Sequence, residues 1–355
     1  MRVVFLIIDA LPARHVGRDT TPVIASLAAE GAFAVGRAVM TSATYPNHAT
    51  FATGAEPSAH GLLANWIVAE RGPVPAQKVG PAVPTIFDAC RAAGRTSAAV
   101  VGDHNLIGVM GATSADEHWP PDGRLPDDIR RDGHGYAADD EVIPRLWPFL
   151  LDGGPDLTIG HLNEPDTAAH VHGPDSDAAI ECFRATDARL REVIDTLRSG
   201  WDDTVLIVVS DHDQETATTD IGIGIWPAAE ARGLFGIPEG NGAVVWGDDP
   251  DGGAWLNTLD GVAGHAEAWP GARVVWADPG RWFAVPPGIE HPFEPGQHGG
   301  ATTRDQVAVV AGGHPAARAI AASIAARRPE AADWAPTIAS LLGLDLVNAT
   351  GTSLA

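Results

Sequence analysis

The sequence predicts an α/β fold, doubly wound around a mostly parallel central sheet, because strand-like and helix-like segments alternate along its 355 residues. Short apolar runs without polar alternation are typical of strands buried on both faces, as in a parallel sheet. Five such runs occur, at residues 3–8, 98–101, 157–162, 205–209 and 307–310. The chain contains neither an internal repeat nor a low-complexity linker, so we expect a single domain spanning residues 1–355.

Three segments between these runs have the features of helices. Residues 21–31 open with Thr-Pro, a combination that suits the first turn of a helix. Residues 177–198 carry the longest stripe of apolar side chains spaced three or four positions apart. Residues 333–342 are followed by Gly343, which predicts that a helix stops there.

Two stretches interrupt the alternation of strands and helices. Residues 103–145 are rich in Asp, Gly and Pro, and residues 213–297 are rich in Gly, Pro and Trp. Loops of this length are uncommon unless they are functional or are structured as insertions. We expect both stretches to leave the sheet and build the rim of a pocket, and residues 213–297 to form an inserted cap subdomain.

The composition is that of a globular protein, with 45% hydrophobic residues and a net charge of −23. A field of this sign repels nucleic-acid backbones and anionic membranes. We therefore expect no nucleic-acid polymer and no membrane among the partners, whereas the oligomeric state is not predicted. Any anionic substrate must be attracted locally, by metal ions or by the N-terminus of a helix.

The cellular compartment is inferred from the N-terminus and the cysteines. Residues 3–8 form a short apolar run that ends in a carboxylate, which predicts a buried strand rather than a signal peptide, and no run reaches the ~18 residues of a membrane helix. We therefore expect a cytoplasmic protein. Its two cysteines, Cys90 and Cys182, lie far apart in apparent helices, which excludes a disulfide framework or a Cys-based zinc site.

Aspartate and histidine residues gather at the ends of the predicted strands. These residues are Asp9, Asp166, His170, Asp211, His212 and His298. In open α/β sheets, ligands bind outside the carboxyl ends of the strands. Carboxylate oxygen and imidazole nitrogen together suit zinc, with manganese or iron as alternatives. Taken alone, Asp9 is as well explained as a helix N-cap and His298 as a hydrogen-bonded surface residue, but the combination favours a metal site.

A hydroxyl-rich segment at residues 41–54 is the second chemical feature. Thr44 lies just before a probable helix, whose N-terminal amides favour an anion. On residue chemistry alone, an ordinary threonine N-cap is the more economical interpretation.

Several motifs together resemble a known family. Thr-Tyr-Pro-Asn-His at 44–48, Thr-Gly at 53–54 and His-Gly-Leu-Leu-Ala-Asn at 60–65 are similar to the nucleophile region of nucleotide pyrophosphatase/phosphodiesterases, members of the alkaline phosphatase superfamily. That family also carries an Asp after the first strand, an Asp-x-x-x-His followed by Gly-Pro, an Asp-His pair and a late His-Gly. All four occur here in that order, and the resemblance extends from residue 3 to residue 343.

The resemblance implies an alkaline phosphatase-like fold and a site with two zinc ions. Thr44 would be the nucleophile and would share one ion with three other ligands, Asp9, Asp211 and His212. The second ion would be held by Asp166, His170 and His298. Asn47 corresponds to a catalytic position near the phosphate, and Asn65 to a further substrate-binding position.

The implied activity is hydrolysis of phosphodiester or pyrophosphate bonds in small anionic phosphorylated substrates, through a phospho-threonine intermediate. The chain departs from the family pattern after the Asp-His pair, where Asp213-Gln214-Glu215 replaces a segment that commonly contains glycine. Because of this difference, the family pattern does not predict the local turn or the substrate pocket.

Other activities of the superfamily compete with this interpretation. Phosphonoacetate hydrolase has a similar nucleophile segment, and a phosphomonoesterase is a further alternative; the non-enzyme alternative is an inactive metal-binding homologue. Residues 39–70 contain no Lys or Arg, and Lys78 is the only lysine of the chain. A dianionic monoester or a substrate carboxylate would need a Lys or Arg side chain nearby to balance its charge. We therefore expect phosphodiesters to be preferred.

Overall fold

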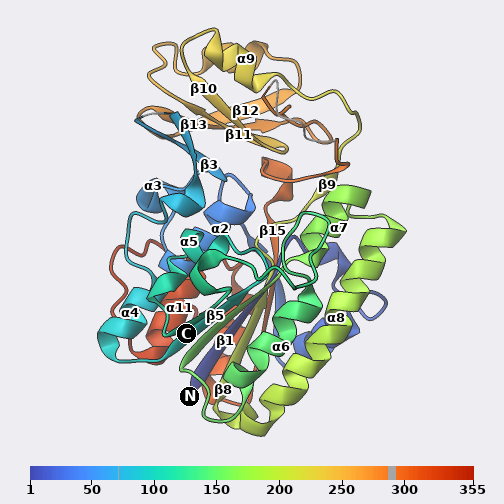
Figure 1. Ribbon diagram of the computed structural model, residues 1–355, viewed down its shortest axis with the longest axis vertical. Helices are drawn as coiled ribbons and strands as arrows, with labels where there is room; N and C mark the ends of the chain where they lie inside the picture. The colour runs from blue at the N-terminus through green and yellow to red at the C-terminus, as the bar shows by residue number, and fades with distance from the viewer. Residues whose placement is uncertain (71, 287–292) are drawn as a thin grey trace.

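The computed structural model describes residues 1–70, 72–286 and 293–355 and contains one large mixed sheet. Its strands are β1 (Arg2–Ile8), β2 (Ala32–Arg37), β5 (Ser97–Val101), β6 (Glu117–Trp119), β7 (Leu157–Leu162), β8 (Thr204–Val209) and β15 (Asp305–Ala311). They lie in the order β2-β15-β8-β1-β7-β5-β6, and β15 runs antiparallel to both of its neighbours while the other pairs are parallel. All five predicted strands are therefore confirmed, in a mostly parallel sheet (Figure 1).

Both faces of the sheet are buried, which explains why β1 is apolar without alternation. Its Val3, Phe5 and Ile7 side chains belong to one hydrophobic cluster, and Val4, Leu6 and Ile8 belong to the other. Phe5 packs against Phe51 and Trp334, with ring centroids 5.4 and 6.2 Å away. Truncating such a buried aromatic ring to alanine costs about 3–5 kcal/mol.

Helices cover each face. One layer consists of α1 (Pro22–Glu30), α6 (Asp139–Leu150) and α8 (Asp177–Leu197). The opposite layer consists of α2 (Thr44–Thr53), α4 (Ile86–Ala93), α10 (Pro315–Ala326) and α11 (Trp334–Leu342). The predicted helices at 21–31, 177–198 and 333–342 correspond to α1, α8 and α11. Gly343 ends α11 in the left-handed conformation, at φ 66°.

An aspartate on the apolar stripe of α8 is explained by a helix cap. The carboxylate of Asp187 accepts hydrogen bonds from the backbone amides of Val23 and Ile24, both at 2.9 Å. These amides belong to the first turn of α1, where N–H groups have no partner within their own helix. A buried carboxylate thereby fixes the crossing of α1 against α8.

A second sheet lies beyond the carboxyl ends of the parallel strands, at the top of the molecule in Figure 1. It contains β10 (Phe235–Glu239), β11 (Gly242–Trp246), β13 (Ala272–Ala277) and β12 (Val262–Trp269) in that antiparallel order. Helix α9 (Ile225–Glu230) packs on it, and the layer has a hydrophobic cluster of its own that includes Trp255 and Val275. We call residues 213–297 the cap segment.

Shorter elements connect these layers. They are α3 (Pro57–His60), β3 (Trp66–Ala69), β4 (Gly72–Pro75), α5 (Leu106–Val109), α7 (Glu164–His172), β9 (Glu215–Thr216) and β14 (Gly296–Gln297). β9 pairs with β14, so the two ends of the cap segment lie side by side. The expectation that residues 103–145 leave the sheet is wrong at β6, which pairs with β5 at the sheet edge. Within the described residues, no helix has both the length and the apolar character needed to cross a membrane.

Candidate metal centre

The sheet topology brings the predicted site residues to one edge. β8, β1 and β7 are adjacent and parallel, so Asp211, Asp9 and Asp166, which follow them, emerge at the same edge. His298 precedes β15, and because β15 runs antiparallel, this residue reaches that edge too. Thr44 is the first residue of α2 and faces the same place.

The first group of side chains consists of Asp9, Thr44, Asp211 and His212. Nε2 of His212 lies 3.2 Å from Oγ1 of Thr44, 3.3 Å from Oδ2 of Asp211 and 3.6 Å from Oδ1 of Asp9. Nδ1 of His212 lies 3.1 Å from the carbonyl oxygen of Asp213 and donates to it, which leaves the lone pair of Nε2 directed into the group.

Two oxygens of this group are orphaned. Oδ1 of Asp9 and Oδ2 of Asp211 are buried and have no hydrogen-bond partner among the described residues. Burial, followed by the neighbouring Asp211, raises the pKa of Asp9 well above its usual range, and burial also raises the pKa of Asp211. Two unpartnered buried carboxylate oxygens around a neutral imidazole are costly without a cation, so this donor set fits a divalent metal ion.

The second group consists of Asp166, His170 and His298. Asp166 and His170 are four residues apart on α7 and therefore share a helix face. Oδ1 of Asp166 lies 3.4 Å from Nε2 of His170 and 3.9 Å from Nε2 of His298. Nδ1 of His170 donates to the carbonyl oxygen of Gly296 at 2.9 Å, which leaves its Nε2 free for a metal.

The two groups are adjacent, because the rings of His212 and His298 stack with centroids 3.9 Å apart. Burial lowers the pKa of His212 to about 4 and lowers the pKa of His298 well below its usual value, so both rings are neutral at pH 7. Neutral imidazole is the form that binds metals. All seven residues expected as metal ligands are therefore brought together by the fold.

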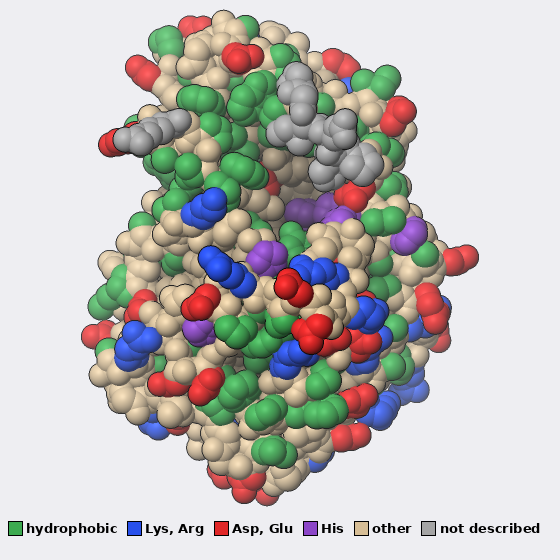
Figure 2. Space-filling view, viewed as in Figure 1, with side chains coloured by type: hydrophobic (Ala, Val, Ile, Leu, Met, Phe, Trp, Pro, Cys, Tyr) green, Lys and Arg blue, Asp and Glu red, His purple; other side chains and the backbone are tan. Residues whose placement is uncertain are grey.

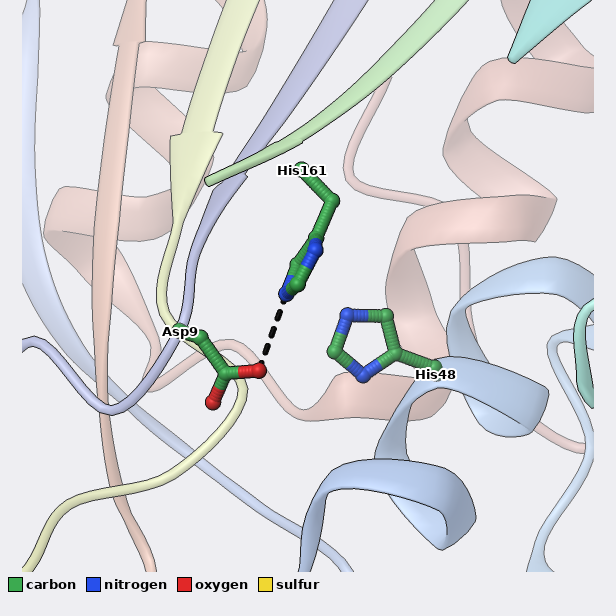
Figure 3. Close-up of side chains that lie close together, drawn as sticks. All are labelled: Asp9, His48 and His161. Carbon is green, nitrogen blue, oxygen red and sulfur yellow. Dashed lines mark hydrogen bonds and ion pairs between the residues drawn. The ribbon is translucent and has the colours of Figure 1, made fainter. Parts of the chain in front are cut away.

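Two further histidines lie beneath the first group and were not among the expected site residues (Figure 3). Nε2 of His161, on β7, lies 2.9 Å from Oδ2 of Asp9. His48, on α2, donates from Nδ1 to the carbonyl oxygen of Thr44 at 2.8 Å, and its ring meets that of His161 edge-on at 4.9 Å. The only sequence signal for His161 is an ionisable residue inside a predicted buried strand.

The residues that depart from the family pattern are all bonded. The carboxylate of Asp213 binds the guanidinium of Arg14 at 2.7 Å. The Gln214 side chain is buried and donates from Nε2 to Oδ1 of Asp166 at 2.6 Å. Oε1 of Glu215 accepts from the side-chain amide of Asn241 at 2.7 Å, a bond within the cap segment.

A cavity of about 300 Å³ opens beside the two groups, between the cap and the main sheet. Figure 2 shows histidine side chains inside this hollow. Its walls carry aromatic rings, including Tyr45, Tyr136 and Trp282, and no Lys or Arg is among its described lining residues. Burial raises the pKa of two lining carboxyls, Asp103 to about 7 and Glu239 to about 8.

Asn65 lines this cavity, whereas Asn47 does not. Oδ1 of Asn65 accepts from the amide of Tyr45 at 3.3 Å, so its NH₂ group is turned away from that bond. Asn47 is fully buried, with Oδ1 accepting from Val39 N and Nδ2 donating to Ala43 O. The expected contact between Asn47 and a phosphate is therefore not supported; its amide instead braces the loop that leads to Thr44.

Comparisons with known proteins agree with this geometry. The family model described as type I phosphodiesterase / nucleotide pyrophosphatase matches residues 3–226. Ectonucleotide pyrophosphatase/phosphodiesterase family member 1 of Rattus norvegicus is 26% identical over 211 residues, which cover 57% of this chain and 22% of the rat protein. The chain thus matches less than a quarter of that relative's length.

Solved structures share the fold over nearly the whole chain. Murine ectonucleotide pyrophosphatase/phosphodiesterase 5 has a TM-score of 0.74 at 16% identity, covering 99% of this chain and 98% of that one. An inactive threonine-to-alanine variant of the same murine protein was solved in complex with AMP, with a TM-score of 0.75 and 15% identity over 99% and 97% of the two chains. Phosphonoacetate hydrolase from Sinorhizobium meliloti 1021 reaches 0.66 at 18% identity, over 87% and 89%.

Proposed function

The chain belongs to the type I phosphodiesterase / nucleotide pyrophosphatase family, and from this premise we propose that it is a metal-dependent phosphodiesterase with Thr44 as its nucleophile. The observation that carries the proposal is the position of the Thr44 hydroxyl, 3.2 Å from Nε2 of His212 and next to two orphaned carboxylate oxygens. A neutral hydroxyl is a weak nucleophile at pH 7 and needs such activation.

The proposed centre holds two zinc ions, with manganese or iron as alternatives. Asp9, Thr44, Asp211 and His212 would hold one, and Asp166, His170 and His298 the other. Two ions in such a centre lower the pKa of a bound hydroxyl and stabilise the charge that develops on oxygen during in-line displacement.

The chain's own residues supply the remaining parts of the reaction. Oγ1 of Thr44 gives up its proton to solvent and forms a bond to phosphorus while the bond between phosphorus and one ester oxygen breaks. That oxygen takes up a proton and leaves as an alcohol, and the resulting phospho-threonine still carries the second ester group. Attack by water on the opposite side of phosphorus then breaks the Oγ1–phosphorus bond, restores the Thr44 hydroxyl and releases a phosphate monoester. The N-terminal amides of α2 and the NH₂ group of Asn65 face the phosphate position and favour its non-bridging oxygens.

The cavity determines which phosphate esters fit. Its aromatic walls suit the organic group of a small diester, including a nucleoside such as the one in the AMP bound by the murine neighbour. Phosphonoacetate hydrolase is the second fold neighbour, but the described lining contains no Lys or Arg to pair with a substrate carboxylate. We therefore favour a diester or nucleotide-like substrate over a phosphonate.

The test is a chromogenic assay on the full chain with bis-p-nitrophenyl phosphate. We expect hydrolysis that stops after chelation and returns when zinc is added. Brief reaction followed by acid quenching and mass spectrometry is expected to find a p-nitrophenyl phosphoryl group on Thr44, because the first step releases only one of the two nitrophenolates. Undiminished hydrolysis in the presence of EDTA would rule the proposal out, and absence of hydrolysis with two ions bound would favour the inactive metal-binding homologue.

A further inference from the structure

Two side chains that are not expected to touch a metal each hold the carboxylate of one site. We propose that His161 and Gln214 are positioning residues, His161 for Asp9 in the first site and Gln214 for Asp166 in the second. This inference rests on the proposed function only for the presence of the ions. It assigns to each site a separate residue that controls its affinity.

His161 is placed by strand pairing. In the parallel register of β1 with β7, His161 is opposite Ile7, so its ring lies near the end of β1, which Asp9 follows. Nδ1 of His161 is buried without a hydrogen-bond partner among the described residues, so the ring proton is assigned to Nε2, which donates to Oδ2 of Asp9. This bond is the dashed line of Figure 3.

The hydrogen bond from His161 determines which oxygen of Asp9 is available to an ion in the first site. With Oδ2 engaged, Oδ1 is the oxygen that faces His212, at 3.6 Å from its Nε2. An aspartate that rotates freely would present either oxygen or both. The imidazole therefore selects one oxygen of Asp9 for the first site and fixes its direction.

Gln214 holds the carboxylate of the second site through Oδ1 of Asp166, the same oxygen that lies 3.4 Å from Nε2 of His170. Nε2 of Gln214 donates to Oδ1 of Asp166 at 2.6 Å and also lies 3.4 Å from the carbonyl oxygen of that residue, so one amide holds both ends of Asp166. The position behind the amide is kept open by Gly296. A side-chain carbon at 296 would collide with Oε1 of Gln214 and with the carbonyl of Ala169.

Two other roles make different predictions. The hydrogen bonds of His161 and Gln214 would matter for folding alone if they only stabilised the buried interior. His161 would instead be a ligand if Asp9, His48 and His161, which lie close enough together to form a metal-ligand group, held a third ion. The metal affinities of variants separate a positioning role from a role in folding alone, and a count of bound ions separates it from a third metal site.

The experiment measures metal binding by the full chain. Protein stripped with chelator is reloaded with zinc, the ions are counted by elemental analysis, and affinities are measured by competition with a chromophoric chelator. We expect two ions in the unmodified chain. His161→Phe and Gln214→Met each remove the hydrogen-bond donor at nearly unchanged side-chain size. Each should lower the affinity for one zinc ion by about 10- to 100-fold and leave the affinity for the other ion unchanged.

Cobalt substitution identifies which site is affected. The first site has one imidazole and three oxygen ligands, and the second has two imidazoles, so their visible spectra differ. His161→Phe should alter the first spectrum and Gln214→Met the second. His161→Gln places an amide donor near the position of Nε2 and should recover most of the lost affinity, which a role in packing alone would not predict.

Matched controls come from buried or partly buried hydrogen bonds outside the centre. Nε2 of His60 bonds to Thr50 at 2.9 Å, and Nε2 of Gln77 bonds to Asn105 at 3.0 Å. His60→Phe and Gln77→Met should leave both zinc affinities unchanged. If His161→Phe fails to fold, His161→Gln and Gln214→Met still decide the matter.

Three results would overturn the inference. Variants that bind two ions with unchanged affinity would remove the positioning role and leave the proposed function intact. A count of three ions that falls to two in His161→Phe would make His161 a ligand. An unmodified chain that binds no ion and hydrolyses diesters without one would reject the proposed function itself, together with this inference.

Discussion

The hydroxyl of Thr44 lies 3.2 Å from Nε2 of His212, on the side of the loop that faces the cavity. Ser42, two residues earlier, points its hydroxyl the opposite way, to the carbonyl of Gly300 at 2.7 Å and to Thr303 at 2.8 Å. Of these two hydroxyls, only that of Thr44 is offered to a substrate.

Thr44→Ala is expected to reduce kcat for a phosphodiester by roughly 10³-fold or more, because the nucleophile is lost. Its thermal unfolding should stay close to that of the unmodified chain. Ser42→Ala should keep activity and lose about 1 kcal/mol or more of stability, because it removes buried hydrogen bonds. Steady-state kinetics and thermal unfolding of both variants check this, and an inactive Ser42→Ala with an active Thr44→Ala would reverse the assignment.

Diesters are expected to be better substrates than monoesters. Two divalent ions against the carboxylates of Asp9, Asp166 and Asp211 leave one net positive charge, which matches a singly charged diester. Arg304, the basic residue closest in sequence to His298, donates to the carbonyl oxygen of Ala38 and is not among the described lining residues. Comparison of kcat/KM for bis-p-nitrophenyl and p-nitrophenyl phosphate at one pH tests this. A tenfold monoester advantage, about 1.4 kcal/mol, would contradict it.

Removal of the metal should destabilise the fold more at high pH than at low pH. Without a cation, the pKa of both Asp9 and Asp211 lies above its ordinary value, 3.8, so these two carboxyls bind more protons in the folded chain than in the unfolded chain. Their contribution to the stability of the stripped protein therefore falls as pH rises, whereas His212 and His298, which stay neutral in the folded chain, contribute in the opposite direction with or without the metal. We expect the difference in Tm between zinc-loaded and EDTA-treated protein to be larger at pH 8 than at pH 5. Equal differences, or a preparation without transition metal that remains active, would count against the centre.

Glu239→Gln is expected to stabilise the protein at alkaline pH. Burial raises the pKa of Glu239 from 4.5 to about 8, so its contribution to stability falls as pH rises through this range and the full penalty is present above pH 8. The glutamine carries no charge and keeps an oxygen for the bond from Asn65 N, which Glu239 accepts at 2.8 Å. Denaturant unfolding at pH 9 should show a gain of roughly 2–5 kcal/mol, and the two proteins should be similar at pH 5. A variant that is less stable at both pH values would refute the assignment.

The strands and the gathering of the expected metal-ligand residues at one sheet edge were predictable because both leave local signals in the sequence. Strands that are buried on both faces are mostly apolar, and although Asp9 alone also suits a helix N-cap, Asp and His residues after several such runs together indicate a shared site. The position of His298 in the site was harder to predict from the sequence. It precedes its strand, and the antiparallel direction of β15 that brings it to the centre depends on pairing with β8 and β2.

The roles of Asn47, His161 and Gln214 depend on contacts between distant parts of the chain. Asn47 fits the family motif, yet its amide is used entirely by the backbone of Val39 and Ala43. His161 bonds to a residue 152 positions away, and Gln214 to one 48 positions away. No periodicity or spacing in the sequence encodes such partners.

The cap segment leaves the main sheet just after Asp211 and His212 and returns to it through His298. Ions held as proposed would tie each end to the main domain separately: the first ion would join His212 to Asp9, and the second would join His298 to His170. In the chain-entropy model, the cross-link from His170 to His298 closes a loop of roughly 130 residues and restricts the unfolded ensemble by about 5 kcal/mol, as a disulfide does. In a protein with two unpaired cysteines, metal ions would thus close loops of the chain as disulfide bonds do in other proteins. Metal starvation would then release the segment that selects the substrate along with the ions that activate the nucleophile.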